Sequence, residues 1–224
     1  TGGTISGNEA KQGGAMFCLR GTITITGGRI FDNTATSAAG AIYVNGFATT
    51  PAGSKDDVSI RKGIVTVQNV DFYGHKAVTG GAFEVGNFGT LNLENCKVHD
   101  NIAESIGGGV YINKVSFATL KNVEIYDNEA QTGGGGGLAI NVGSDVQAEN
   151  LTVENNRADG IGGGIYNRGR LELRDSTVRA NSTTGNGGGI GTFKTSSIPL
   201  SVDAGLFVYD CLITDNRAQK GAGI

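Results

Sequence analysis

Carboxylates recur beside asparagines along this sequence, and two of them are spaced in a way that permits acid–base chemistry. An Asp stands directly before an Asn in four of eight similar segments, at Asp32, Asp100, Asp127 and Asp215. Asp100 and Asp127 belong to successive segments, so stacking of those segments would bring their carboxylates to about 5 Å, the separation used by retaining glycosidases. Asp before Asn also suits a turn. We favour the turn-forming role and keep catalysis at Asp100 and Asp127 as the alternative.

A second repeated position carries tyrosines and amides, which suit binding rather than catalysis. Aromatic rings and amides spaced along one face match the ring faces and hydroxyls of a sugar chain. We therefore predict a shallow ligand-binding trough, floored by tyrosines and rimmed by asparagines. The alternative is that outward tyrosines only stack to support a sheet. The residues of the predicted trough are Tyr43, Tyr111, Tyr166, Asn87, Asn113 and Asn141.

The elements that must position these residues follow from a repeated unit. An aliphatic or aromatic residue, two variable residues and an Asn recur eight times, with His75 replacing Asn once. Successive units lie 25 to 28 residues apart except at two longer steps. Apolar residues alternate with period two before each unit after the first, as at Ile23 and Ile25, and again after a glycine cluster, as at Ile42 and Val44. Each repeat is therefore expected to hold three short strands.

Three short strands and three turns per repeat, without any helical period, predict an all-β fold. The expected architecture is a right-handed, single-stranded parallel β-helix, a solenoid of about eight coils with three short strands per coil, stacked about 4.8 Å apart. Residues 1–224 form one β-helix domain with loop insertions at 45–63 and 193–205. A sandwich or antiparallel barrel is the main alternative fold, but it leaves the recurrence of one residue type at equivalent positions unexplained.

Three of the repeated positions are expected to be structural. The Asn is expected to point inward at a turn, where its amide pairs with buried backbone groups and with its neighbours. Two residues later, a row of small residues, mostly Ala, is expected to let a tight corner close, and the glycine clusters are expected to supply corners with positive φ. The predicted ladder consists of Asn8, Asn33, Asn101, Asn128, Asn156, Asn181 and Asn216, interrupted by His75.

The composition of the chain argues against several classes of binding partner. The chain has 39 glycines among 224 residues, 18 Lys and Arg against 21 Asp and Glu, and three cysteines. A net charge of −3 offers no broad basic surface for nucleic acid, and no apolar stretch approaches the roughly 20 residues that cross a bilayer. The cysteines are too scattered for a metal site. We expect no metal, no cofactor, no nucleic acid and no direct membrane insertion.

The repeats also resemble a known group of proteins. Segments such as NEAKQGGAMF, HKAVTGGAFEV, NIAESIGGGVYI and NRADGIGGGIYN resemble the polymorphic outer-membrane protein repeats and the related adhesin-like surface proteins of bacteria and archaea. The resemblance covers nearly the whole chain. It implies a secreted or surface-displayed module used for adhesion, and it supplies no catalytic residues.

We expect a non-catalytic extracellular adhesin or stalk at the cell surface, with a host-surface or matrix glycan or a protein receptor as partner. Both ends stop inside a repeat, so further repeats or capping domains of the same chain are expected as well. One alternative is a polysaccharide lyase or glycoside hydrolase of the pectate-lyase-like β-helix type, acting through Asp100 and Asp127. Another is a structural, self-assembling spacer.

Overall fold

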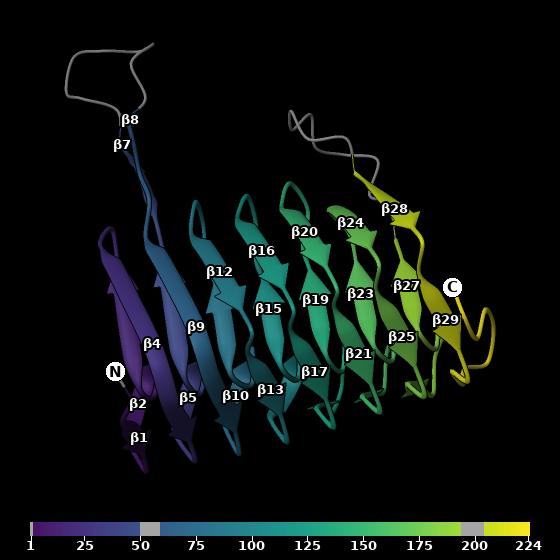
Figure 1. Cartoon of the computed structure of the whole chain (residues 1–224), viewed down its shortest axis with the longest axis horizontal. Helices are drawn as coiled ribbons and strands as arrows, with labels where there is room; N and C mark the ends of the chain where they lie inside the picture. The colour runs from purple at the N-terminus through teal and green to yellow at the C-terminus, as the bar shows by residue number, and fades with distance from the viewer. Residues whose placement is uncertain (1, 50–58, 194–203) are drawn as a thin grey trace.

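The chain winds into a solenoid of about seven turns. A computed structural model describes residues 2–49, 59–193 and 204–224, and every regular element in them is a β-strand (Figure 1). Three parallel sheets run along the solenoid. A full turn adds one strand to each of two sheets, and to the third it adds either one long strand or two short ones. The prediction of an all-β parallel β-helix with three strands per coil is thereby confirmed.

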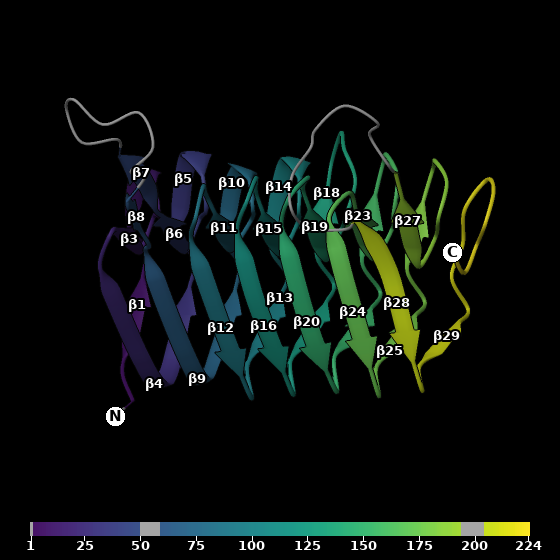
Figure 2. The ribbon, with the colours of Figure 1, turned by 90° about the horizontal axis from the view of Figure 1, so that it is seen from above.

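The largest sheet, called here the long sheet, has 13 strands and bends once in each coil. Its upstream part is seen face-on in Figure 2, and its downstream part follows the bend. The upstream strands are β4 (Thr22–Phe31), β9 (Ile64–Tyr73), β12 (Thr90–Glu94), β16 (Phe117–Lys121), β20 (Asp145–Glu149), β24 (Arg170–Arg174) and β28 (Gly205–Tyr209). Strands β4 and β9 continue through the bend, and the other downstream strands are β1 (Thr4–Ser6), β13 (Lys97–His99), β17 (Glu124–Tyr126), β21 (Thr152–Glu154), β25 (Thr177–Arg179) and β29 (Leu212–Thr214).

Two seven-stranded sheets complete each coil. The second sheet follows the repeated Asn and contains β2 (Glu9–Gln12), β5 (Thr34–Ala38), β10 (Lys76–Thr79), β14 (Ile102–Ile106), β18 (Glu129–Ala130), β22 (Arg157–Ala158) and β26 (Ser182–Thr183). The third sheet follows the glycines and contains β3 (Met16–Leu19), β6 (Ile42–Asn45), β11 (Phe83–Val85), β15 (Val110–Ile112), β19 (Leu138–Ile140), β23 (Ile165–Asn167) and β27 (Ile190–Thr192).

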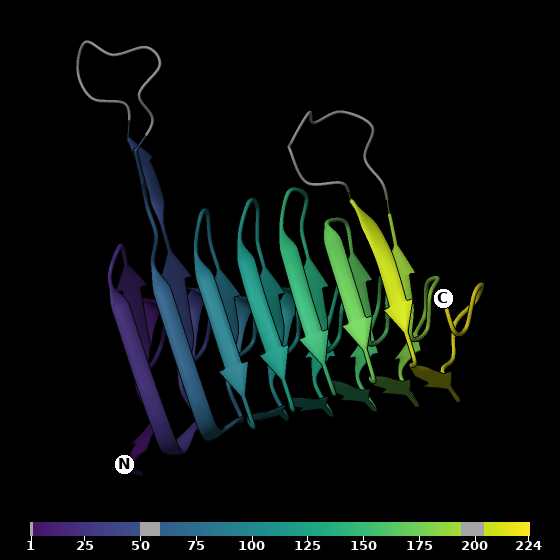
Figure 3. The ribbon, with the colours of Figure 1, turned by 45° about the horizontal axis from the view of Figure 1, so that its top comes forward.

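The two expected insertions both leave the solenoid between the third sheet and the next strand of the long sheet (Figure 3). The first carries an antiparallel hairpin formed by β7 (Phe47–Thr49) and β8 (Ser59–Arg61). Residues 50–58 and 194–203 of these insertions lie outside the described residues.

At the corners of the long sheet the chain turns through single residues whose backbone has a positive φ, the left-handed conformation. Asn95, Asn122 and Asn150 have φ near +50° at the bend, and Asp100 and Asp127 have φ of 53° where the chain leaves for the second sheet. Asn and Asp tolerate this conformation better than other residues with a side chain, because their short polar groups bond locally. The Asp before Asn is thus a corner residue.

The repeated Asn forms a continuous ladder inside the next corner. Asn101 Nδ2 donates to Asn128 Oδ1 at 2.9 Å, and Asn128 Nδ2 donates to Asn156 Oδ1 at 2.9 Å. The same amides donate to backbone carbonyls of the preceding coil, as Asn128 does to Val98 at 2.9 Å. The ladder therefore satisfies polar groups that close packing shields from water.

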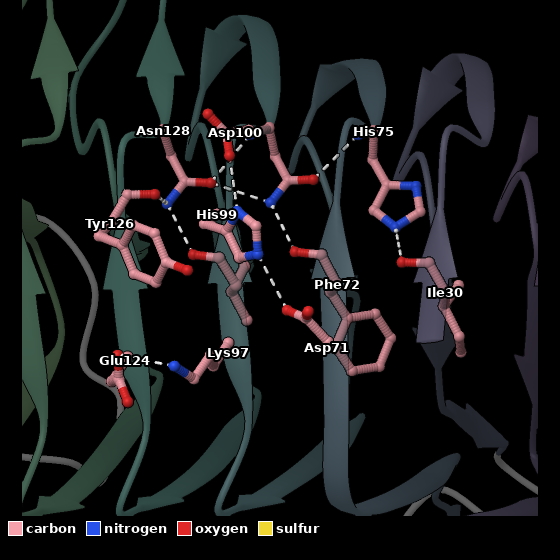
Figure 4. A network of polar contacts seen from close by, with 12 residues as sticks. Ile30, Asp71, Phe72, His75, Lys97, His99, Asp100, Glu124, Tyr126 and Asn128 are labelled. Carbon is pink, nitrogen blue, oxygen red and sulfur yellow. Dashed lines mark hydrogen bonds and ion pairs between the residues drawn. The ribbon is translucent and has the colours of Figure 1, made fainter. Parts of the chain in front are cut away.

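His75 takes the place of an Asn in this ladder without breaking it. Its Nδ1 accepts from the backbone N–H of Asn33 at 3.1 Å. Its Nε2 lies 2.9 Å from the Ile30 carbonyl oxygen (Figure 4). A neutral imidazole protonated at Nε2 supplies one acceptor and one donor, the two functions that an Asn side chain supplies elsewhere in the row. His75 is fully buried, and burial lowers its pKa to about 4.

The row of small residues does not form the tight corner that was expected. It lies in the second sheet, where Ala77, Ala103, Ala130 and Ala158 are in register and buried. These alanines are therefore buried strand residues rather than turn residues.

Glycines close the corner between the second and third sheets. Gly107, Gly135 and Gly162 have φ between 68° and 76°, as expected for these clusters. The following glycine is required for a different reason: a Cβ at Gly108 would lie 2.2 Å from the carbonyl oxygen of Gly136 in the next coil. Adjacent coils therefore approach too closely at this corner for any side chain.

Candidate functional site

The predicted tyrosine and asparagine trough maps to the outward face of the third sheet. Tyr43, Glu84 and Tyr111 occupy one registered row of β6, β11 and β15, and Tyr166 follows in β23 beyond Ala139. However, Tyr43 and Tyr111 are only 9% and 7% exposed. The structure therefore corrects the expectation of an open trough floor at these two rings.

The chain itself covers this face. The corner preceding each strand of the third sheet passes over the outward row, so that a Cβ at Gly134 would lie 3.1 Å from the Tyr166 ring. Near the other end of the row, Ala38 and Ala39 form an apolar cluster with Tyr43. Sequence alternation marks these tyrosines as outward-facing, but it does not reveal that a neighbouring corner lies on top of them.

Beneath this cover is a hydrogen-bonded network centred on Glu84. Its carboxylate accepts from Asn113 Nδ2 at 3.0 Å and from the Thr79 hydroxyl. Tyr111 donates to Asn113 Oδ1 at 3.2 Å, and Asn141 Nδ2 donates to the Tyr111 hydroxyl at 2.8 Å. The sequence analysis did not single out Glu84, although an acidic residue between two tyrosines of one row was a visible signal.

Burial perturbs the titration of this network. Desolvation raises the pKa of Glu84, and desolvation together with the nearby Glu84 carboxylate raises the pKa of Tyr111 to about 12. Asn113 and Asn141 hold these groups, whereas Asn87 is exposed and outside the network. The predicted site residues are thus only partly brought together, and their polar groups are largely satisfied by one another.

The second predicted site, at Asp100 and Asp127, lies at the corners that follow β13 and β17 of the long sheet. Figure 4 shows Asp100 beside His99. Asp100 Oδ2 is 2.6 Å from His99 Nδ1, and Asp71 Oδ1 is 2.9 Å from His99 Nε2. Partial burial and the neighbouring Asp100 and Glu154 carboxylates raise the pKa of Asp127. This arrangement places acidic groups in adjacent coils around one imidazole, but both aspartates also serve as left-handed corners.

An aromatic stack runs beside these carboxylates. The rings of Phe31, Tyr73, His99 and Tyr126 follow one another at centroid distances of 4.6 to 5.2 Å, with interplanar angles of 13° or less. Because each inner ring has its faces covered by its neighbours, the stack cannot offer those faces to a sugar. Its stacking stabilises the register of the coils.

The outward residues of the seven upstream strands of the long sheet form a different surface, called here the open face. None of them is buried, in contrast to the third sheet. The central row contains Thr24, Thr66, Asn92, Thr119, Gln147, Glu172 and Phe207 in unbroken register. The first five positions of this row carry hydroxyl or amide groups. The last two carry a carboxylate and an aromatic ring.

A groove of about 240 Å³ crosses the open face between successive coils. The side chains that line it include Thr119, Gln147, Glu172 and Arg174. Arg174 lies over the Tyr209 ring, 4.1 Å from its centroid, and its Nε donates to Glu172 at 2.8 Å. This is an accessible surface with hydroxyl, amide, carboxylate and guanidinium groups side by side, which is a set that bonds to sugar hydroxyls.

A family model described as "Right handed beta helix region" matches residues 57–224, about three quarters of the chain. The chain belongs to the right-handed β-helix family. This membership confirms the predicted right-handed β-helix architecture. The finer resemblance to polymorphic outer-membrane protein and adhesin-like repeats stays a prediction. No curated protein and no solved structure matches this chain.

Membership of the right-handed β-helix family establishes the architecture of this protein, which both binding proteins and enzymes use. Within the described ranges 2–49, 59–193 and 204–224, three or more His, Cys, Asp or Glu side chains nowhere gather in a way that could hold a metal ion. In the same ranges we find no helix with the length and apolar character needed to traverse a bilayer.

Proposed function

We propose that this β-helix protein is a non-catalytic, extracellular adhesin-type module that binds an extended polysaccharide along the open face of its long sheet. The observation that carries this proposal is the unbroken row of hydroxyl, amide and charged side chains, none of them buried, repeated at the spacing of the coils. A long ligand can contact equivalent groups in successive coils, so weak individual contacts add along its length.

Thr119 and Gln147 are the best residues for testing the proposal. They are exposed, in register on adjacent strands and at the edge of the groove. No hydrogen bond from either side chain to another described residue is present, so their substitution leaves the fold intact. Removing two hydrogen bonds to a ligand, at about 1 kcal/mol each, lowers affinity roughly tenfold or more.

The experiment measures binding of the wild type and of a Thr119→Ala, Gln147→Ala variant to a glycan array, followed by titration of the best ligand. A matched control is Thr152→Ala, Thr177→Ala, which changes outward positions on the downstream part of the same sheet. Loss of binding only in the groove variant supports the proposal. Equal binding by both variants, or no glycan binding by the wild type, refutes it.

An enzymatic alternative rests on Asp100 and Asp127. Its support is the raised pKa of Asp127 beside the Asp100 carboxylate, because one protonated and one ionised carboxyl group is the arrangement that glycoside hydrolysis requires. Long incubation with polysaccharides, followed by assay of reducing ends and unsaturated products, tests this alternative. Product formation by the wild type that is abolished in Asp127→Asn would replace the binding proposal.

A further inference from the structure

A pocket of about 210 Å³ lies at the edge of the third sheet, between β23 and the start of β28. It is lined by residues at two connections, β23–β24 and β27–β28, including Asn167, Arg168, Thr192, Phe193 and Leu206. Arg168 follows β23 directly, and its backbone amide donates to the Ile140 carbonyl at 2.8 Å, which fixes where its side chain starts. Thr119 and Gln147, the residues used above to test the open face, do not line this pocket.

The charge of Arg168 is not neutralised by any described residue. Its Nε is buried and without a hydrogen-bond partner among the described residues, and its guanidinium forms no ion pair with a described carboxylate. Arg157, Arg170 and Arg179, by contrast, each lie within 3.1 Å of a carboxylate oxygen. A half-buried cation with an unmet donor is unfavourable unless a further group compensates it.

The remaining lining residues are complementary to an anion attached to a ring. None of the described lining residues is acidic, Thr192 offers a hydroxyl, and Phe193 is 50% exposed. The amide of Asn167 is already used, since Nδ2 donates to Gly205 and Oδ1 accepts from Gly169. The free capacity of the pocket is therefore one guanidinium, one hydroxyl and one aromatic face.

We propose that this pocket binds an acidic sugar, with its carboxylate or sulfate on Arg168 and its ring against Phe193. Carboxylate and sulfate share the planar or fork-like acceptor pattern that a guanidinium recognises. The proposal does not depend on binding at the open face, because it concerns different residues on a different sheet edge.

Titration calorimetry with three polymers of one backbone tests the proposal: dextran, carboxymethyl-dextran and dextran sulfate oligosaccharides. Saturable binding of one or both anionic forms, with no binding of dextran at this site, is expected. Arg168→Gln is expected to weaken that binding at least tenfold, because a charge-assisted hydrogen bond is lost. Arg20→Gln is the matched control, since it removes the same charge at an arginine that lies over Phe47 instead.

Several results would overturn the proposal. They are equal losses in Arg168→Gln and Arg20→Gln, unchanged affinity in a folded Arg168→Gln protein, or absence of saturable anion binding by the wild type. If Arg168→Gln does not fold, Arg168→Lys replaces it, because Lys keeps the positive charge but lacks the two parallel N–H donors of a guanidinium. Affinity of Arg168→Lys for the anionic polymers equal to that of the wild type would count against the site. Asp203 lies outside the described residues. A double-mutant cycle of Arg168→Gln and Asp203→Asn tests whether this carboxylate pairs with Arg168: melting-temperature changes that do not add would identify an internal counter-ion and overturn the proposal.

Discussion

Replacing His75 by Asn is expected to remove most of the acid sensitivity of this fold between pH 6.5 and pH 4. The His75 ring accepts a hydrogen bond from the Asn33 amide through Nδ1, and protonation of that nitrogen destroys the acceptor. Burial holds the pKa of His75 at about 4 in the folded protein, against an ordinary value of 6.5. The unfolded chain therefore binds a proton in this pH range that the folded protein does not bind.

The sign and size of the effect follow from this difference. The contribution of His75 to the free energy of unfolding is complete above pH 6.5, falls as the pH is lowered towards 4, and is then constant. A pKa difference of about 2.5 corresponds to a loss of about 3 kcal/mol at pH 4. Asn at this position supplies the same acceptor and donor without titrating, so His75→Asn should remain within about 1 kcal/mol of wild type at pH 7.

Urea unfolding followed by circular dichroism at pH 7, 6, 5 and 4 measures this difference. His99→Asn is the control, since it removes the other histidine of the chain, which faces Asp71 and Asp100 outside the ladder. Glu84 contributes in the opposite direction, because its raised pKa favours the folded state at low pH, but this contribution cancels between wild type and His75→Asn. Parallel stability profiles of these two proteins would refute the reasoning.

Three further predictions concern the ladder, the glycine corner and the covered tyrosines. Asn128→Ala leaves the backbone N–H of Asn101 and the Val98 carbonyl without these hydrogen-bond partners, so it should lower the free energy of unfolding by about 3 kcal/mol. The control Asn87→Ala, at an exposed site, should change the free energy of unfolding by no more than about 0.5 kcal/mol. Gly108→Ala should strongly lower the melting temperature because its Cβ would overlap the Gly136 carbonyl, and Gly21→Ala, whose Cβ meets nothing closer than 3.9 Å, should not. The triple change of Tyr43, Tyr111 and Tyr166 to Ala should destabilise the fold, since two of these rings are buried; a triple variant as stable as wild type in denaturant titration would contradict the burial.

Much of the architecture was predictable because equivalent positions of successive coils share one environment, so the same residue types recur in the sequence once per coil. The spacing of Ile30 and Asn33 recurs at Val98 and Asn101, and equivalent residues of successive coils do lie in register. The role of the second sheet was not predictable in the same way: a strand as short as Glu129–Ala130 has no alternation to recognise, so its alanines were taken for a corner.

For the candidate sites, too, the sequence determined some features and the tertiary structure determined others. Period-two alternation determined by itself which side of each strand Tyr111 and Thr119 face, since side chains of a strand alternate strictly between its two sides. Only the tertiary structure decided that Tyr111 is buried and Thr119 exposed, because a glycine corner covers one sheet and leaves the other open. Likewise the alternation places Arg168 just beyond a strand. Only the packing of neighbouring coils decides that no described carboxylate lies within ion-pair distance of it, because those coils are built from residues distant in the chain.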